Sequence, residues 1–308
     1  MKRIVSDTLG LLIIFCIGFF RPAYGASRFA SEIDFSNPSN ATLIKIFGEN
    51  SEDSAGNSLA SGDINGDGKE DIIIGANKAN EGRGATYVVF GSATIFNNDS
   101  IELNTSSGIL KIIGKGVVDW SGYSVAVGNI NGDLYEDVII GAHKGDPSGR
   151  INAGEVYVIF GNATIHATGT IDLSGSTPGV TRIYGDTQED YTGFSVAAGD
   201  IDGDGYDDVI IGAPQALYAG RNNVGKTYVV YGSSDFSTKS TIDLNGSPSD
   251  VLSIYGETED DLSGYSVASG DLDNDGYDDV VIGAYNAYST MGGTYVIMGY
   301  AGITALNT

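Results

Sequence analysis

The chain has 308 residues, of which 45 are glycine and only 6 are proline, and 41% are hydrophobic. This apolar share is enough to build a folded core, which excludes a wholly disordered chain. Forty Asp and Glu against 16 Lys and Arg give a formal net charge of -24. Such a charge repels nucleic acid and anionic membrane surfaces and favours cations, so we expect no nucleic-acid partner.

The first 25 residues differ from the rest of the chain. Two basic residues precede an apolar stretch from 9 to 20, and Ala23-Tyr24-Gly25 has the small residues of a cleavage site. This pattern predicts a signal peptide over residues 1–25, export to the cell surface or beyond, and no stable membrane insertion after cleavage. An uncleaved N-terminal anchor is the alternative. The single cysteine, Cys16, lies in this stretch, so the cleaved chain would need a source of stability other than disulfides, such as metal ions.

One pattern occurs four times in the remaining chain. Each copy has a Gly-aromatic-Ser-Val-Ala segment or a relaxed version of it, an acidic loop, an apolar run that ends in glycine, and a Tyr-Val segment. The copies begin at Gly56, Gly122, Gly193 and Gly264. Self-similarity at a nearly constant spacing is the mark of a repeat architecture.

The segments of each copy read as β-strands. They are short, rich in β-branched and aromatic residues, and bounded by Gly, Asn, Asp and Ser. No stretch after the signal has the sustained periodicity of a helix. We therefore expect an all-β chain with four strands per unit, as in the stacked blades of a β-propeller. The expected domain is 26–308, with units near 49–114, 115–185, 186–256 and 257–308.

The N-terminal strand belongs by its sequence to the last unit. Residues 33–48 repeat the pattern of 242–256, which supplies the fourth strand of a unit, whereas 257–308 holds only three strand segments. We therefore predict a propeller of four four-stranded blades, in which the N-terminal strand completes the last blade and closes the ring. Closure would hide two sheet edges. An incomplete ring, or association into a larger propeller, is the alternative.

Each unit has a nine-residue acidic loop between its first two strands. Oxygen-bearing side chains stand at positions 1, 3, 5 and 9 of every loop, and position 7 can offer its backbone carbonyl. A hard cation such as Ca²⁺ takes six to eight oxygen ligands, so we expect about four Ca²⁺ sites. The predicted ligands are Asp63, Asn65, Asp67, Lys69 and Asp71; Asn129, Asn131, Asp133, Tyr135 and Asp137; Asp200, Asp202, Asp204, Tyr206 and Asp208; and Asp271, Asp273, Asp275, Tyr277 and Asp279.

The spacing excludes an EF-hand, whose loop ends in a Glu at position 12 between two helices. Position 12 here is an isoleucine within an expected strand. A solvated acidic turn is the other alternative, but it does not account for four copies at one place in the repeat. The second loop has two neutral amides, Asn129 and Asn131, and it has Leu134 where the other loops have a glycine suited to left-handed backbone. We therefore expect the second site to be the weakest.

With these loops, the sequence resembles the FG-GAP repeats of the integrin α-subunit propeller. Gly193-Phe194 matches the first part of the name loosely and in reverse, and Gly212-Ala213-Pro214 matches the second part outright. The resemblance covers about residues 33–300. It implies that the calcium loops lie on a lower face and that partners dock on an upper face. The integrin propeller has seven blades, whereas this sequence has four units. We therefore do not expect a full integrin subunit.

The other strand connections carry candidate partner-binding residues, since exposed aromatic and arginine side chains are common in hot spots. The candidates are Arg83, Trp120, Arg150, Tyr191, Tyr218, Arg221 and Tyr288. The alternative is that each arginine pairs with a neighbouring acid and that the aromatic rings cover sheet edges. The two histidines, His143 and His166, are expected to be ordinary loop residues.

The function that these patterns favour is a secreted calcium-binding propeller that binds an extracellular protein or glycan without catalysis, as an adhesion module does. A polysaccharide-active enzyme or its carbohydrate-binding module is one alternative, and a purely structural surface repeat is another. We predict no enzyme, because no catalytic constellation recurs and the carboxylates are assigned to metal.

Overall fold

The computed structural model describes residues 43–92, 100–104, 108–246 and 248–301. The predicted signal peptide, Cys16 and residues 33–42 lie outside this part of the chain. The described residues form an all-β structure, which confirms the predicted fold class. Among the described residues, helical structure is limited to short segments, namely η2 (Pro147–Gly149), η3 (Ile165–Ala167), η4 (Phe236–Thr238) and α1 (Ala287–Thr290). No helix among the described residues is long and apolar enough to cross a membrane.

Four antiparallel sheets correspond to the four sequence units, in order along the chain. Unit 1 contains β2 (Ser58–Gly62), β3 (Asp71–Ala76), β4 (Ala85–Val89) and β6 (Ile109–Ile113). Unit 2 contains β7 (Ser124–Gly128), β8 (Asp137–Ala142), β9 (Glu155–Ile159) and β11 (Val180–Tyr184). Unit 3 contains β12 (Ser195–Gly199), β13 (Asp208–Ala213), β14 (Lys226–Val230) and β16 (Val251–Tyr255). Unit 4 contains β17 (Ser263–Gly270), β18 (Asp279–Ala284) and β19 (Gly293–Ile297).

Short parallel strands connect one unit to the next. The segment between the third and fourth strands of unit 2 contributes β10 (Thr170–Asp172), which pairs with β6 of unit 1. In the same way β15 (Thr241–Asp243), from unit 3, pairs with β11 of unit 2. Each of these strands extends the sheet of the preceding unit, so successive units share hydrogen bonds as well as packing.

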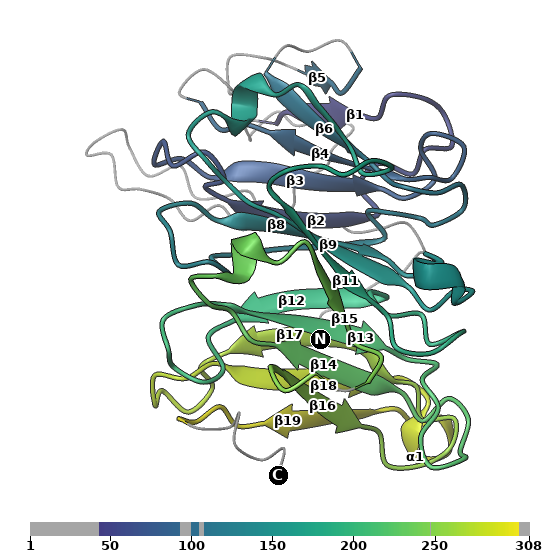
Figure 1. Cartoon of the computed structure of the whole chain (residues 1–308). Coiled ribbons are helices and arrows are strands. Elements are labelled where there is room, and N and C mark those ends of the chain that lie inside the picture. Colours follow the sequence, from purple (N-terminus) through teal and green to yellow (C-terminus); the bar gives the residue numbers. More distant parts are fainter. Residues whose placement is uncertain (1–42, 93–99, 105–107, 247, 302–308) are drawn as a thin grey trace, which may run out of the picture.

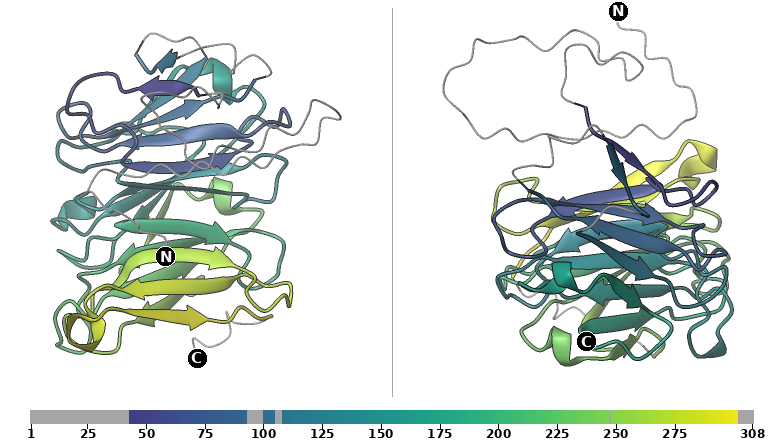
Figure 2. Two further views of the ribbon diagram at one scale, coloured as in Figure 1. Left: turned by 180° about the vertical axis from the view of Figure 1, so that it is seen from behind. Right: turned by 90° about the horizontal axis from the view of Figure 1, so that it is seen from above.

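The units stack face to face, with unit 1 at the top and unit 4 at the bottom of Figure 1 and of the reverse view in Figure 2. The first strands of the units, β2, β7, β12 and β17, contact one another in that order. A separate apolar cluster fills each junction between units: one around Val88 and Ile140, one around Val158 and Ile211, and one around Val229 and Ile282. The core therefore lies between sheets, as expected for propeller blades.

Glycine pairs set the spacing at each junction. A Cβ on Gly75 in β3 would collide with the carbonyl oxygen of Gly122, which begins unit 2. The same relation holds between Gly141 and Gly193. The two glycines of each pair come from the glycine-ended apolar run and the Gly-aromatic segment that recur in the sequence. Both recur because the backbones of adjacent units touch at this point.

The predicted closure of the ring is not confirmed by the strands that the structure describes. β1 (Lys45–Phe47) pairs in parallel with β5 (Ser100–Glu102), at the unit 1 end of the stack, and the described part of unit 4 has three strands. Ile46 and Ile101 pack with Tyr87 of unit 1 in one apolar cluster, and this burial holds β1 there. The described sheets are consistent with a β-propeller, but they do not form a closed ring.

Candidate metal loops

The four acidic loops connect the first and second strands of their units and so lie at the same end of the stacked sheets. The glycine at position 6 has left-handed backbone in three of them, with φ of 80° at Gly68, 90° at Gly205 and 93° at Gly276. This agrees with the turn expected from the sequence. Position 4 is also left-handed, at Gly66, Gly132, Gly203 and Asn274, and the sequence pattern does not predict this.

The third and fourth loops gather three carboxylates each. Asp200, Asp202 and Asp204 offer oxygen atoms that lie within 4.8 Å of one another, and Asp271, Asp273 and Asp275 do the same. The two oxygens of Asp200 accept backbone N–H bonds from Asp204 at 3.1 Å and Gly205 at 3.0 Å. The loop is thus folded around its first carboxylate. Its donor set, carboxylate oxygens close together on a tight turn, suits a hard cation.

Electrostatics also favours a cation in the third loop. Burial, followed by the nearby charges of Asp204 and Asp200, raises the pKa of Asp202. The ionised loop therefore carries a cost of desolvation and like-charge repulsion that a divalent cation would offset.

The first loop has the same fold with one amide in place of a carboxylate. Asp63 accepts backbone N–H bonds from Asp67 at 3.0 Å and Gly68 at 2.7 Å, as Asp200 does in the third loop. Asn65 stands at position 3. The Lys69 ammonium lies 3.0 Å from the Asp67 carboxylate, so this loop holds a positive charge of its own.

The second loop departs from this arrangement. The side-chain amide of Asn129 donates to the backbone carbonyl of Asp133 at 2.8 Å, and that of Asn131 donates to the Asp133 carboxylate at 2.9 Å. The Asn131 amide thus occupies a carboxylate oxygen that a cation would need. Leu134 is 90% exposed and does not adopt a positive φ, so the left-handed backbone seen at position 6 of the other loops is absent here. The loop avoids this strain by giving up the turn that the other loops share.

The position-9 aspartates form a buried anchor beneath the loops. Asp71, Asp137, Asp208 and Asp279 are each 0% exposed. In the third unit, Asp208 accepts backbone N–H bonds from Ile201 at 3.0 Å and Gly232 at 2.8 Å, and the other three units repeat both bonds. Burial raises the pKa of Asp208 to about 8. These residues, predicted as ligands, hold the base of each loop and lie outside the three-carboxylate clusters.

The position-7 residues, predicted to offer a carbonyl, also link neighbouring loops. The ring of Tyr135 lies over Gly66 of the preceding loop, and those of Tyr206 and Tyr277 lie over Gly132 and Gly203. A Cβ at any of these glycines would collide with the ring. Glycine at position 4 is therefore paired with tyrosine at position 7 of the next loop.

Position 8 is a structural residue that the sequence reasoning missed. Glu136, Asp207 and Asp278 each accept a hydrogen bond from the backbone N–H of the first residue in the preceding loop, at 2.6, 2.7 and 3.2 Å. Burial makes the largest contribution to the raised pKa of each of these three carboxyl groups. The available signal was an acidic residue at position 8 of every loop, including Glu70.

The opposite end of the sheets carries the predicted partner surface, and its arginines are mostly engaged. Arg83 bonds the Asp172 carboxylate at 2.6 Å, and Arg150 bonds that of Asp243 at 2.7 Å. Arg221 donates to the backbone carbonyl of Glu257. Two of the three arginines therefore pair with an acid, as the alternative interpretation expected.

The aromatic candidates fall into two groups rather than one patch. Trp120 and Tyr191 both contact His143, whose ring is buried and whose pKa burial lowers to about 3. His143 lies in a turn, as a loop residue does, but it is buried and neutral. Tyr218 stacks on Tyr255, next to Arg221, and the Tyr288 hydroxyl bonds the Glu257 carboxylate. Tyr218 and Tyr288 are 40% and 51% exposed.

Comparison with known proteins identifies these units. The model of the FG-GAP repeat matches residues 55–89, 121–159, 192–230 and 263–297, one match per unit. The chain is an integrin alpha-like FG-GAP repeat protein. It is 30% identical over 258 residues to integrin alpha pat-2 of Caenorhabditis briggsae, which covers 78% of this chain and 18% of that protein.

Two further relatives give the same result. Integrin alpha-5 of Xenopus laevis is 28% identical over 246 residues, covering 77% of this chain and 20% of that protein. Integrin alpha-PS2 of Drosophila melanogaster is 27% identical over 280 residues, covering 86% and 18%. The chain thus spans about a fifth of the length of the integrin alpha proteins that it matches.

Proposed function

We propose that this chain is an exported, calcium-binding and non-catalytic module that binds an extracellular protein or glycan, as an adhesion module does. The observation that carries the proposal is the arrangement of the acidic loops. Loops of one design stand side by side at one end of the FG-GAP sheets, and two of them gather three carboxylates within 4.8 Å. Bound calcium would hold these loops in one conformation and stabilise the sheets that they connect.

The residues that would hold calcium are those at positions 1, 3 and 5. Asp200, Asp202 and Asp204 supply three carboxylates in the third loop, and the fourth loop supplies the same set. The first loop would bind through two carboxylates and Asn65. The position-9 carboxylates already accept two backbone N–H bonds each, so we assign them first to the support of the loop and only second to the ion.

Partner binding is placed at the opposite end of the sheets. There Tyr218 and Tyr288 expose aromatic surface close to Arg221 and Glu257. Rigid aromatic rings beside an arginine are the side chains that dominate hot spots in protein interfaces, and they also stack on sugar rings. Calcium would act here indirectly, by fixing the sheets that carry these loops.

The test is binding of the chain to arrays of extracellular-matrix proteins and of glycans, in calcium and in excess chelator. We expect at least one ligand whose binding is lost with chelator and weakened at least tenfold by Tyr218→Ala. The matched control is Tyr300→Ala, which removes a tyrosine of similar exposure outside this group. Binding that does not depend on calcium and is unchanged in the Tyr218→Ala variant would contradict the proposed binding face. The absence of any ligand would favour a structural repeat.

No specific observation favours the enzyme alternative. His143 is buried among aromatic rings, and the shift of its pKa to about 3 keeps it neutral at ordinary pH. Many of the buried carboxylates already accept backbone N–H bonds within their turns and loops. We therefore propose no catalytic role.

A further inference from the structure

The last unit exposes residues that the other three units bury. At each junction the next unit covers three residues: the apolar residue at loop position 2, and the fourth and second residues of the third strand. The covered residues, all 0% exposed, are Ile64, Ile130 and Ile201; Val88, Val158 and Val229; and Thr86, Val156 and Thr227. In unit 4 the equivalents are Leu272, which is 60% exposed, Val296, which is 46% exposed, and Thr294, which is also exposed.

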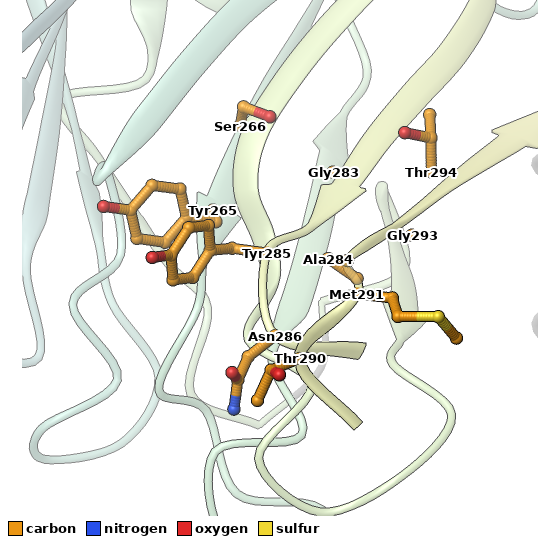
Figure 3. A pocket seen from close by; sticks show the side chains of 11 residues that line it. Tyr265, Ser266, Gly283, Ala284, Tyr285, Asn286, Thr290, Met291, Gly293 and Thr294 are labelled. Atoms are coloured by element: carbon orange, nitrogen blue, oxygen red, sulfur yellow. The ribbon is translucent and has the colours of Figure 1, made fainter. Parts of the chain in front are cut away.

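A cavity of about 640 Å³ lies on this face of unit 4 (Figure 3), and its position shows what fits there. It is lined by Tyr265, Ser266, Gly283, Ala284 and Thr294, among others. The equivalents in units 1–3 contact the Gly-aromatic turn of the following unit: Ser58, Ser124 and Ser195 each donate a hydrogen bond of 2.9 Å to the carbonyl of that turn's glycine. The cavity therefore occupies the position in which one more such turn would pack against unit 4.

The opposite end of the stack carries the complementary surface. Unit 1 begins with its own copy of the turn at Gly56, and Leu59 behind it is 36% exposed, whereas its equivalents Val125 and Val196 are 8% and 9% exposed. Glu70 is exposed at position 8, where Glu136 in the next unit accepts a bond from the preceding loop. Both ends of the stack thus present one half of a junction that the chain builds three times.

We propose that the exposed face of unit 4 binds the front of unit 1 in a second copy of this chain, head to tail, with the geometry of the internal junctions. The Ser266 hydroxyl would donate to the Gly56 carbonyl of the partner copy. The backbone N–H of Asp271 would donate to the Glu70 carboxylate of the partner copy. A heterologous contact of this kind either closes into a ring or continues as a filament.

Two departures from the repeat pattern, one at each end of the stack, match each other. Inside the chain, glycine at loop position 4 receives the ring of tyrosine from the next loop. The last loop has Asn274 at position 4, whose Cβ would collide with such a ring, and the first loop has Lys69 in place of tyrosine. A flexible lysine stem can pass Asn274, and its ammonium would lie beside the carboxylates of the fourth loop. The two ends are therefore suited to each other.

The edges of the sheets agree with this docking. The third strands β4, β9 and β14 pair with a fourth strand, whereas β19 has none among the described residues. In the second copy, β1 stands before unit 1 as β6 stands before unit 2. It carries a parallel partner, and Gly48 approaches Ala55 as Gly114 approaches Ser121. Docking would bring β1 of the second copy to the open edge of β19.

A second copy is favoured over the chain's own N-terminal end. Units 1 and 4 lie at opposite ends of the stack (Figure 1), and backbone contacts between glycines fix the angle at each of the three junctions. Bringing the two ends of one chain together would require all three junctions to change. A second copy requires no change.

The first test is the mass of the folded protein in calcium, measured by light scattering and sedimentation over a range of concentrations. We expect species heavier than one 32.0 kDa chain at high concentration. Thr294→Arg should weaken self-association at least tenfold without changing the circular dichroism spectrum, because it places a charge in the docking face. Thr168→Arg, at an exposed site just before β10, should have no effect. A monomer at every concentration would overturn the proposal.

The second test distinguishes a partner copy from the chain's own end. In a background without Cys16, Lys69→Cys and Asn274→Cys proteins are prepared separately, mixed and oxidised. We expect a disulfide-linked heterodimer in the mixture and a much lower yield from either protein alone. If the mixture stayed unlinked while a Lys69→Cys/Asn274→Cys double variant cross-linked within one monomer, the chain would close on itself, and the proposal would be wrong.

Discussion

The Asp207 carboxylate accepts a hydrogen bond of 2.7 Å from the backbone N–H of Asn129. Asp207 belongs to the third acidic loop and Asn129 begins the second, so the bond joins the loops of adjacent units. Glu136 and Asp278 make the same link at the other two junctions. The loops therefore form a connected row. Removal of one position-8 carboxylate should destabilise the neighbouring loop as well as its own.

Asp207→Ala should lower the free energy of unfolding by on the order of 1 kcal/mol, because it leaves the Asn129 N–H without its acceptor. Asp207→Asn keeps an acceptor and should cost less. Urea unfolding in calcium measures both changes. The matched control is Glu70→Ala, at low protein concentration, where we expect a change within about 0.5 kcal/mol. Equal losses from Asp207→Ala and Glu70→Ala would show that the link between loops contributes nothing.

The pH dependence of stability should include a contribution from Asp190. This carboxyl is 3% exposed and accepts the Thr187 N–H at 3.1 Å, and burial raises its pKa from 3.8 to about 7. The folded state thus binds the proton more tightly than the unfolded state. The resulting stabilisation is fully present below pH 3.8 and is lost as the pH rises to about 7.

Asp190→Asn should remove this loss. Between pH 4 and pH 7 the stability of the variant should fall less steeply than that of the natural protein, by at most about 1.4 kcal/mol per pH unit. Urea unfolding in excess chelator at several pH values gives the two slopes. All other titrating groups are the same in both proteins, so identical slopes would mean that Asp190 is not protonated in the folded state.

The calcium sites should be unequal. Titration followed by calorimetry should show about three tighter ions and one weak or absent, since Asn129 and Asn131 direct amide hydrogens at Asp133. Asp273→Ala should reduce the calcium bound by more than Asn131→Ala does. Asn129→Asp with Leu134→Gly should restore the missing ion, because it supplies a carboxylate and lets position 6 turn as in the other loops. Indistinguishable effects of Asp273→Ala and Asn131→Ala would contradict the ranking by carboxylate number.

The strands and the loops could be predicted from the sequence because they depend on local chemistry. The short β-branched and aromatic runs that contain Ile73 and Val88 mark buried strands, and Gly68, Gly205 and Gly276 mark left-handed turns. These features are set by residues close together in the chain. The same is true of the Asp and Asn spacing in the four loops.

The rest depends on contacts between units, which a single repeat does not reveal. From the sequence alone, Glu136 is one more acidic residue in an acidic loop. Only the structure shows that it accepts a hydrogen bond from the Asp63 N–H of the preceding unit. The pattern of β1 predicts a fourth strand, but it does not reveal the parallel pairing of β1 with β5 of unit 1. His143 reads as a loop residue until the rings of Trp120 and Phe194 surround it.

The most direct test of the central proposal is the melting temperature of the folded chain in calcium and in excess chelator. Binding to the folded state alone should stabilise it by about 2.7 kcal/mol per site at a hundredfold excess of calcium over Kd, so the melting temperature should fall clearly on chelation. A double variant, Asp202→Ala with Asp273→Ala, should lose most of this difference. The same melting temperature in calcium and in chelator would contradict the assignment of the acidic loops as calcium sites.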